Sequence, residues 1–130
     1  MSYQFLTVEE VIEINENQIT LYGGDFGIRD QGLLESAVKS AEATFNKAYL
    51  NTFPFEMAAS YLLSICQNHP FVDGNKRTAY VAALVFLDWH GIDLEVDEDK
   101  AYEFVMKVAQ GKVTKEEAAS FLETHAVLQG

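Results

Sequence analysis

Residues 80–87, YVAALVFL, form the stretch that most restricts the fold of this chain. Every residue in it is aliphatic or aromatic, so a helix through this region is apolar around nearly its whole circumference. Such a helix is stable only when other elements surround it. We therefore expect a helix from about Asn75 to about His90, ended by Gly91, at the centre of the fold.

Helical periodicity also runs through most of the remaining chain, and alternating strand patterns are few. The six expected helices begin at or near Thr7, Asp30, Pro54, Asn75, Asp97 and Thr114. Thr7 and Thr114 each stand three residues before a glutamate, which is the spacing of a capping box. Pro54 fits the first turn of a helix, and Gly23 is expected to end the first one.

Three short segments between the helices have no helical pattern. Residues 27–30 look like a turn, and residues 44–53 are expected to form a short hairpin or an irregular flap. Residues 93–96 are expected to pair as a short strand. The helical periodicity predicts an all-α fold, and the sequence has no internal repeat, linker or low-complexity tract. It is expected to be a single domain over residues 1–130, a bundle of about six helices.

The charge balance limits the partners that such a domain can have. Nine basic and twenty acidic residues give a formal net charge of −11, whereas binding to nucleic acid or anionic membranes needs clustered lysine and arginine. We therefore expect no direct nucleic-acid or membrane partner, and a basic protein partner suits the acidic surface better. The single cysteine, Cys66, excludes an internal disulfide, and the N-terminus lacks the features of a signal peptide. The expected location is cytoplasmic.

The reactive side chains are concentrated in HPFVDGNKRTA, residues 69–79, between the third and fourth expected helices. The first N–H groups of a helix lack intrahelical partners and, with the helix dipole, form an anion site that commonly binds phosphate. Gly74 allows close backbone approach, and Lys76 and Arg77 add two cations beside these amides. The residues expected to bind phosphate are Gly74, Asn75, Lys76 and Arg77.

Other side chains of this segment have complementary chemistry. Asp73 is a carboxylate beside an anion site, which becomes favourable when Mg²⁺ bridges carboxylate and phosphate. His69 lies four residues earlier, and histidine titrates near neutral pH, so it can act as a general base toward a hydroxyl. Phe71 is expected to point inward and anchor the loop, while Asn75 either contacts phosphate or holds the loop's shape.

Each of these residues also has a purely structural interpretation. His69 alone fits a helix C-cap, Asp73 alone fits an N-cap, and Lys76 with Arg77 fits an exposed basic pair. Their occurrence together in one short segment favours the functional interpretation. A metal site of His69, Asp73 and His90 has no recognised ligand spacing, and the segment lacks the Gly-Lys-Ser/Thr ending and the preceding strand of a P-loop.

The segment resembles the signature of the Fic/Doc superfamily, His-x-Phe-x-Asp/Glu-Gly-Asn-x-Arg. The matching positions are His69, Phe71, Asp73, Gly74, Asn75 and Arg77. Residues 22–37, which contain YGG and GIRDQGLLESA, are similar to the N-terminal part of the Doc ("death on curing") branch. Together with the helix spacing, the resemblance covers about residues 5–125.

The resemblance implies a fold, an activity and residue roles. Family members are helical bundles with the motif loop between two core helices, and they transfer part of a nucleoside triphosphate such as ATP onto a hydroxyl of a target protein. Most attach AMP, whereas the Doc branch is associated with phosphorylation of the translation elongation factor Tu, which arrests protein synthesis. By position, His69 would be the general base, Asp73 the Mg²⁺ ligand and residues 74–77 the phosphate cradle.

Two departures from the AMP-transferring members favour phosphoryl transfer. Lys76 stands where those members have a second glycine, and Tyr80 where they have a second arginine. A bulkier, charged loop without that arginine should hold the triphosphate differently, and its position decides which phosphorus faces the hydroxyl. We therefore expect a kinase-like transferase. AMP transfer (AMPylation) is the alternative, and a non-catalytic module that binds nucleotide or antitoxin is the rival from another class.

Regulation and target binding follow from the same resemblance. Many members carry an inhibitory helix with Ser/Thr-x-x-x-Glu-Gly/Asn, but here Ile12 stands four residues before Glu16. This implies inhibition in trans by a separate antitoxin, as in Doc toxin–antitoxin pairs, where a disordered segment folds onto the toxin. Residues 44–53 lie where family members keep a flap that docks the target, so their aromatic side chains either serve that role or cover the core.

Overall fold

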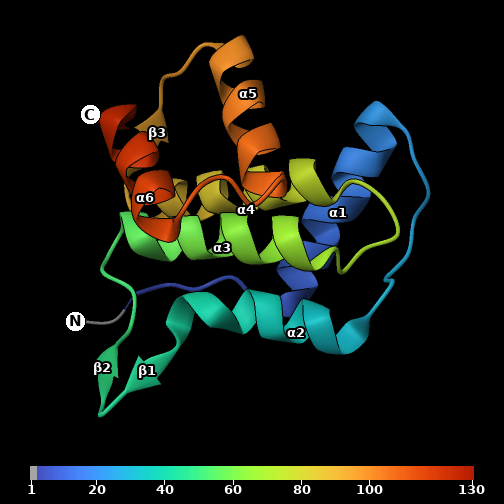
Figure 1. Cartoon of the computed structure of the whole chain (residues 1–130), viewed down its shortest axis with the longest axis horizontal. Helices are drawn as coiled ribbons and strands as arrows, with labels where there is room; N and C mark the ends of the chain where they lie inside the picture. The colour runs from blue at the N-terminus through green and yellow to red at the C-terminus, as the bar shows by residue number, and fades with distance from the viewer. Residues whose placement is uncertain (1–2) are drawn as a thin grey trace.

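The computed structural model describes residues 3–130, and the helices of this range form one bundle (Figure 1). The helices are α1 (Val8–Tyr22), α2 (Gln31–Lys39), α3 (Phe55–Asn68), α4 (Asn75–Trp89), α5 (Glu98–Ala109) and α6 (Lys115–Thr124), with a 3₁₀ turn, η1 (Ser40–Glu42), after α2. The strands are β1 (Thr44–Phe45), β2 (Ala48–Tyr49), β3 (Ile92–Leu94) and β4 (Ala126–Leu128). The predicted all-α fold with six helices is confirmed.

The helices begin where the sequence places their caps. Thr7 and Thr114 both complete a capping box, in which the threonine side chain accepts from the third helical N–H and the glutamate there accepts from the threonine N–H. The Asp30 carboxylate accepts from the Leu33 N–H at 2.9 Å and caps α2. Gly23 ends α1 with φ of 87°, a conformation that glycine adopts readily.

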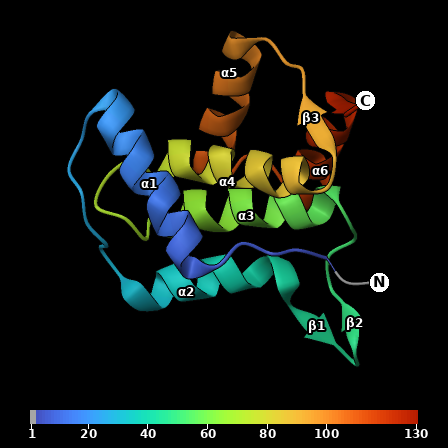
Figure 2. The ribbon, with the colours of Figure 1, turned by 180° about the vertical axis from the view of Figure 1, so that it is seen from behind.

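The core is centred on α3 and α4, the helices that precede and follow the motif loop. In both views α3 runs between α2 and α4, while α1 crosses α4 near the end where α4 begins (Figures 1 and 2). Tyr61 and Leu62 of α3 and Phe86 and Leu87 of α4 have no exposed surface. Burying each such side chain stabilises the fold by roughly 1.5–3 kcal/mol. The apolar centre of α4 is therefore enclosed, as its composition requires.

The N-terminal segment joins this core through a buried hydrogen bond. The Leu6 N–H donates to the Tyr61 hydroxyl at 2.9 Å, and the Tyr3 ring stacks on Phe53 with centroids 4.1 Å apart. Burial raises the pKa of the Tyr61 hydroxyl, since the phenolate would have to form inside the core. The segment thereby ties the start of α1 to the base of the hairpin.

The segments between the helices agree only partly with expectation. Residues 44–53 do contain a hairpin, with Thr44 opposite Tyr49 in an antiparallel pair. The strand expected at residues 93–96 is Ile92–Leu94, and its partner is the C-terminal strand β4. The turn expected at residues 27–30 is present only as a bend at Arg29, since Ile28 forms an antiparallel bridge with Phe71 and the backbone here pairs with the motif loop.

The aromatic residues of segment 44–53, which were expected either to dock the target or to cover the core, differ in exposure. Phe45 and Tyr49 are 67% and 42% exposed, whereas Phe53 is half-buried and packs against the core. Within residues 3–130, no helix combines the length and apolar character needed to cross a membrane.

Candidate active site

The motif loop, residues 69–77, joins the end of α3 to the first turn of α4. His69 is the C-cap residue of α3, with φ of 49° and ψ of 55°, in the left-handed region that L-residues rarely adopt. His69 is exposed to solvent. His69 is thus a helix cap, and the same position presents an imidazole at the surface.

Asn75 holds the loop in shape. Its side-chain oxygen accepts from the Phe71 N–H at 2.9 Å, and its side-chain nitrogen donates to the Phe71 carbonyl at 3.0 Å. The amide therefore pairs with both backbone groups of one residue, as a neighbouring strand would. Phe71 itself is 1% exposed and lies in the core. The loop-holding contact expected of Asn75 is therefore present in the structure.

The side-chain amide of Asn15, on α1, also holds the loop through hydrogen bonds. Asn15 is 2% exposed, and its side-chain nitrogen donates to the Asp73 carbonyl at 2.9 Å and to the Thr78 hydroxyl at 3.1 Å. Gly74 lies directly against this contact with φ of 72°. A Cβ at Gly74 would lie 3.0 Å from Ile19 Cδ1 and 3.3 Å from the Asn15 side-chain nitrogen. Both the backbone conformation and the close packing require glycine here.

Backbone amides hold both oxygens of the Asp73 carboxylate. Its Oδ1 accepts from the Gly74 N–H at 3.1 Å, and its Oδ2 accepts from the Asp25 N–H at 3.1 Å. The N-cap position of α4 belongs to Gly74, so the interpretation of Asp73 as a plain N-cap is wrong. Each carboxylate oxygen has a second lone pair, and the residue is exposed, so the group can still accept a cation.

The N-terminus of α4 provides the geometry of an anion site. The Thr78 N–H makes a helical bond to the Gly74 carbonyl at 2.9 Å. The preceding residues, Asn75, Lys76 and Arg77, lie in the first turn, where backbone N–H groups lack an intrahelical acceptor. These groups and the positive end of the helix dipole favour a bound anion.

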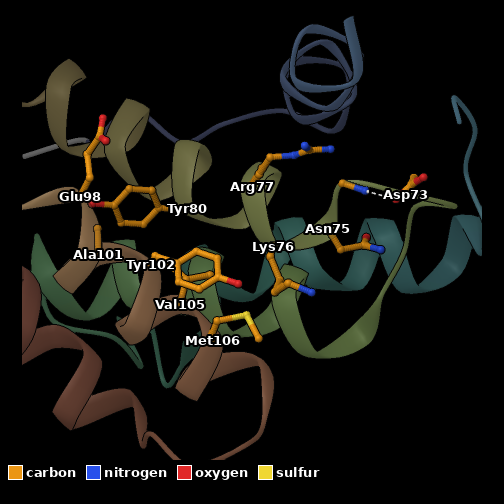
Figure 3. Close-up of a pocket in the computed structure, with 11 residues that line it drawn as sticks. Asp73, Asn75, Lys76, Arg77, Tyr80, Glu98, Ala101, Tyr102, Val105 and Met106 are labelled. Carbon is orange, nitrogen blue, oxygen red and sulfur yellow. Dashed lines mark hydrogen bonds between the residues drawn. The ribbon is translucent and has the colours of Figure 1, made fainter. Parts of the chain in front are cut away.

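The two cations of the motif are directed differently. Figure 3 shows Lys76 and Arg77 extending to different sides of the α4 N-terminus. The Arg77 Nη2 donates to the Gly23 carbonyl at 3.1 Å, and its Cζ lies 5.3 Å from the centroid of the Tyr22 ring, a cation–π distance. Lys76 is exposed. In this structure Arg77 thus connects α4 to the end of α1.

A cavity of about 560 Å³ opens beside this helix terminus. It is lined by Asp73, Gly74, Asn75, Lys76, Arg77 and Tyr80, and on its other side by Glu98, Ala101, Tyr102, Val105 and Met106 of α5 (Figure 3). Its size suits a small organic ligand. The cavity brings together five predicted site residues, Asp73 to Arg77, whereas His69 and Phe71 are not among the residues that line it.

Burial raises the pKa of two side chains, Tyr80, which lines the cavity, and Cys66 in the core. Burial raises the pKa of the Tyr80 hydroxyl, which therefore stays protonated and can donate a hydrogen bond. Burial also raises the pKa of the Cys66 thiol to about 11, and the positive charge of Lys76 offsets only part of this effect. Cys66 is fully buried, as its apolar neighbours predict, and is an inert core residue.

The comparison with protein families agrees with this arrangement. Residues 5–87 match the family described as the Fic/DOC family. The matched range contains α1, α2, α3 and the motif loop, together with most of α4. The chain therefore belongs to the Fic/DOC family.

Two relatives place the chain more closely, in the Doc branch of that family. A protein named Toxin Doc, from Mycolicibacterium smegmatis, is 40% identical over 90 residues, which is 68% of this chain and 69% of the relative. A protein named Protein kinase doc, from Escherichia phage P1, is 30% identical over 117 residues, covering 90% of this chain and 91% of the relative.

Three contributions to the site have only weak signals in the sequence. Asn15 stands among apolar residues on the buried face of α1, and an amide in such a position is the one signal that it pairs with a buried partner. The Asp25 backbone N–H that holds Asp73 carries no side-chain signal. Tyr102 and Met106 of α5 line the cavity, but the sequence could not assign them to the site because α5 follows an ordinary helical pattern.

Proposed function

We propose that the protein is a Doc-like toxin of a toxin–antitoxin pair, which transfers a phosphoryl group from a nucleoside triphosphate to a hydroxyl of a target protein. The observation that carries this proposal is the cavity beside the N-terminus of α4, lined by residues Asp73 to Arg77. Family membership and the names of the two relatives support it. The candidate target is the translation elongation factor Tu, and the candidate co-substrate is ATP.

The nucleotide would bind across the cavity. Its phosphates would accept from the first-turn N–H groups of α4, with Gly74 allowing close approach and Lys76 adding charge. Its nucleoside would lie toward α5, where Tyr80, Tyr102 and Met106 offer an apolar wall with aromatic surface. Arg77 can join the phosphates only by releasing the Gly23 carbonyl or by using its remaining N–H donors.

Asp73 fits the role of a magnesium ligand. Mg²⁺ keeps several waters and is commonly held by one or two carboxylates together with substrate phosphates, so a single carboxylate beside an anion site suffices. Among residues 3–130 there is no group of three or more His, Cys, Asp or Glu side chains able to hold a metal. When bound, Mg²⁺ would neutralise charge on the phosphates.

His69 would act as the general base. Its imidazole nitrogen would take the proton of the acceptor hydroxyl as that oxygen forms a bond to the γ-phosphorus. The bond between the γ-phosphorus and the bridging oxygen to the β-phosphate would break, and the nucleoside diphosphate would leave. His69 does not line the cavity and is exposed, which suits a base that meets a protein hydroxyl arriving from outside.

AMP transfer is the second candidate because it uses the same base, carboxylate and helix terminus. Tyr80, which lines the cavity where the AMP-transferring members have an arginine, favours phosphoryl transfer over it. The rival from another class is a module that binds nucleotide or antitoxin without catalysis. A binding module has no need for both an exposed imidazole and a carboxylate in the motif loop, so the presence of both His69 and Asp73 favours an enzyme.

The proposed partners are an antitoxin and the target protein. The net charge of −11 favours an antitoxin segment with basic or apolar residues. The exposed aromatic residues of the hairpin, Phe45 and Tyr49, offer a surface to the target. Both assignments follow the family. The role of the hairpin is tested by measuring target binding after Phe45 and Tyr49 are replaced by serine.

Expression in bacteria tests the proposal directly. Induction of the wild-type chain should stop growth and protein synthesis, whereas His69→Ala, expressed to the same level, should permit growth. His125→Ala is the matched control, because it removes a histidine from the end of α6, remote from the motif in sequence. Equal growth of wild type and His69→Ala, with no label transferred from ATP to any protein of the lysate, would leave the non-catalytic module as the better account.

A further inference from the structure

The α1–α2 loop, residues 23–30, runs along the motif loop and pairs with its backbone. The Val72 N–H donates to the Gly27 carbonyl at 3.0 Å, and the Arg29 N–H donates to the Pro70 carbonyl at 2.7 Å. Ile28 and Phe71 form the antiparallel bridge between these contacts. The backbone of Arg29 is therefore fixed next to the residue that follows His69.

The side chain of Arg29 grips the end of α3. Its Nε donates to the His69 carbonyl at 2.6 Å, and its Nη2 donates to the Asn68 carbonyl at 2.8 Å. The last carbonyls of a helix lack intrahelical donors and carry the negative end of the helix dipole. A planar guanidinium with two parallel N–H groups matches two successive carbonyls, and a lysine ammonium cannot reproduce this geometry.

His69 depends on these hydrogen bonds from Arg29 because of its backbone conformation. With φ of 49° and ψ of 55° it is left-handed, a conformation that a non-glycine residue keeps only when its surroundings over-determine it. The direction of its Cα–Cβ bond, and hence of its imidazole, depends on that conformation. The bond from Arg29 to the His69 carbonyl is made on the same residue whose side chain must be directed.

We propose that Arg29 is a positioning residue for His69: it fixes the left-handed backbone of His69 and thereby aims the imidazole at the acceptor hydroxyl. This inference rests on the proposed function for the role of His69. The competing interpretation is that Arg29 only caps α3 and stabilises the fold. The two differ because a stabilising cap alters the unfolding temperature and leaves the His69 ring unchanged in the folded protein.

Nuclear magnetic resonance separates these interpretations without any activity. The chain has three histidines, so the ring signals of His90 and His125 serve as internal references. In folded Arg29→Ala, the ring signals of His69 should shift and broaden while those references stay in place. Lys39→Ala, which removes an exposed cation from the last turn of α2, should alter none of the three.

Kinetics then tests the consequence for the reaction. With ATP and elongation factor Tu as substrates, Arg29→Ala should lower kcat by about 10- to 100-fold, the scale of a misplaced reacting group, and change the KM for ATP by less than about twofold. Because Arg29 is exposed, added guanidinium at low millimolar concentration should restore part of kcat to Arg29→Ala, and sodium chloride of equal ionic strength should not. Arg29→Lys, which keeps the charge, should retain an intermediate kcat and is used if Arg29→Ala does not fold.

The outcomes distinguish this inference from the proposed function. If wild type transfers no phosphate, the proposed function fails, and the ring signals alone decide whether Arg29 positions His69. If wild type is active while folded Arg29→Ala keeps both its His69 signals and its kcat, Arg29 is only a cap and the inference is overturned.

Discussion

The side chain of Asn75 bonds to both backbone groups of Phe71, accepting from its N–H at 2.9 Å and donating to its carbonyl at 3.0 Å. This pair closes the loop between the last residue of α3 and the first residue of α4. It fixes the backbone of Phe71, which lies between His69 and Asp73 in the loop. The two proposed catalytic groups are therefore held by an amide that need not touch the substrate.

Replacing Asn75 by alanine should destabilise the protein by about 1–3 kcal/mol, because two backbone groups of a buried residue lose their partners. Asn75→Asp keeps the acceptor for the Phe71 N–H but places a second carboxylate oxygen against the Phe71 carbonyl, so it should also destabilise the protein, and its negative charge should weaken nucleotide binding. Urea unfolding and calorimetric titration with ATP measure the two effects. Asn17→Ala, an exposed asparagine of α1, is the control and should change the free energy of unfolding by less than about 0.5 kcal/mol. Unchanged stability of Asn75→Ala would mean that phosphate contact is its main role.

The beginnings of the helices could be predicted, because a helix cap is a contact between residues close in sequence. Thr7 and Thr114 meet their glutamates three positions later, and the pattern is readable without the fold. The contacts that hold the site are of another kind. Arg29 reaches His69 across 40 positions and Asn15 reaches Asp73 across 58, so no local pattern reports them.

Contacts between residues distant in sequence also explain why residues 27–30 differ from the predicted turn. Glycine and aspartate favour turns, but here Gly27 and Arg29 form hydrogen bonds to the motif loop, and only a bend at Arg29 remains of the expected turn. The start of α4 was predictable for the opposite reason. A glycine followed by the polar start of an apolar helix determines that geometry within a few residues of Gly74.

A double-mutant cycle on Asn15 and Thr78 tests the support of the loop from α1. Asn15→Leu should cost about 1–3 kcal/mol, because the Asp73 carbonyl and the Thr78 hydroxyl lose a buried donor. Thr78→Val removes one of the two acceptors, so the effects of Asn15→Leu and Thr78→Val should not add, with a coupling of at least about 0.5 kcal/mol. Urea unfolding of the four proteins gives the coupling. Strict additivity would show that the two side chains do not interact in solution.

Gly24→Ala should displace the proposed magnesium ligand. A Cβ at Gly24 would lie 2.8 Å from Asp73 Oδ2, and its φ of 119° disfavours any side chain. The Asp73 carboxylate should therefore lose its bond from the Asp25 N–H, and the affinity for ATP with Mg²⁺ should fall by about tenfold or more, equivalent to ~1.4 kcal/mol.

The control for backbone strain in that experiment is Gly111→Ala. Gly111 has φ of 73° and nothing within 4 Å of an added Cβ, so it shares the unfavourable conformation without the clash. Gly111→Ala should lower stability and leave the ATP affinity unchanged. If both variants weaken ATP binding equally, general strain accounts for the loss and Asp73 is not involved.

The buried thiol predicts a loss of stability at alkaline pH. Burial raises the pKa of Cys66 to about 11 from 9.0, so above about pH 9 the unfolded chain releases this proton while the folded chain keeps it. The free energy of unfolding should then fall as pH rises, by a total on the order of 2–3 kcal/mol from this group. Cys66→Ala should show a shallower fall between about pH 9 and pH 10 in urea unfolding. The raised pKa values of Tyr61 and Tyr80 act in the same direction and leave a residual slope. Identical slopes for wild type and Cys66→Ala would contradict the burial of an un-ionised thiol.

The transfer of label from ATP to purified elongation factor Tu separates phosphoryl transfer from AMP transfer. Two reactions are compared, one with ATP labelled at the γ-phosphate and one with ATP labelled at the α-phosphate, each with wild type and with His69→Ala. We expect the acceptor to gain label only from the γ-phosphate, only with Mg²⁺ present, and not with His69→Ala. Label from the α-phosphate would show AMP transfer instead, and labelling of equal strength by His69→Ala would contradict the role of the imidazole.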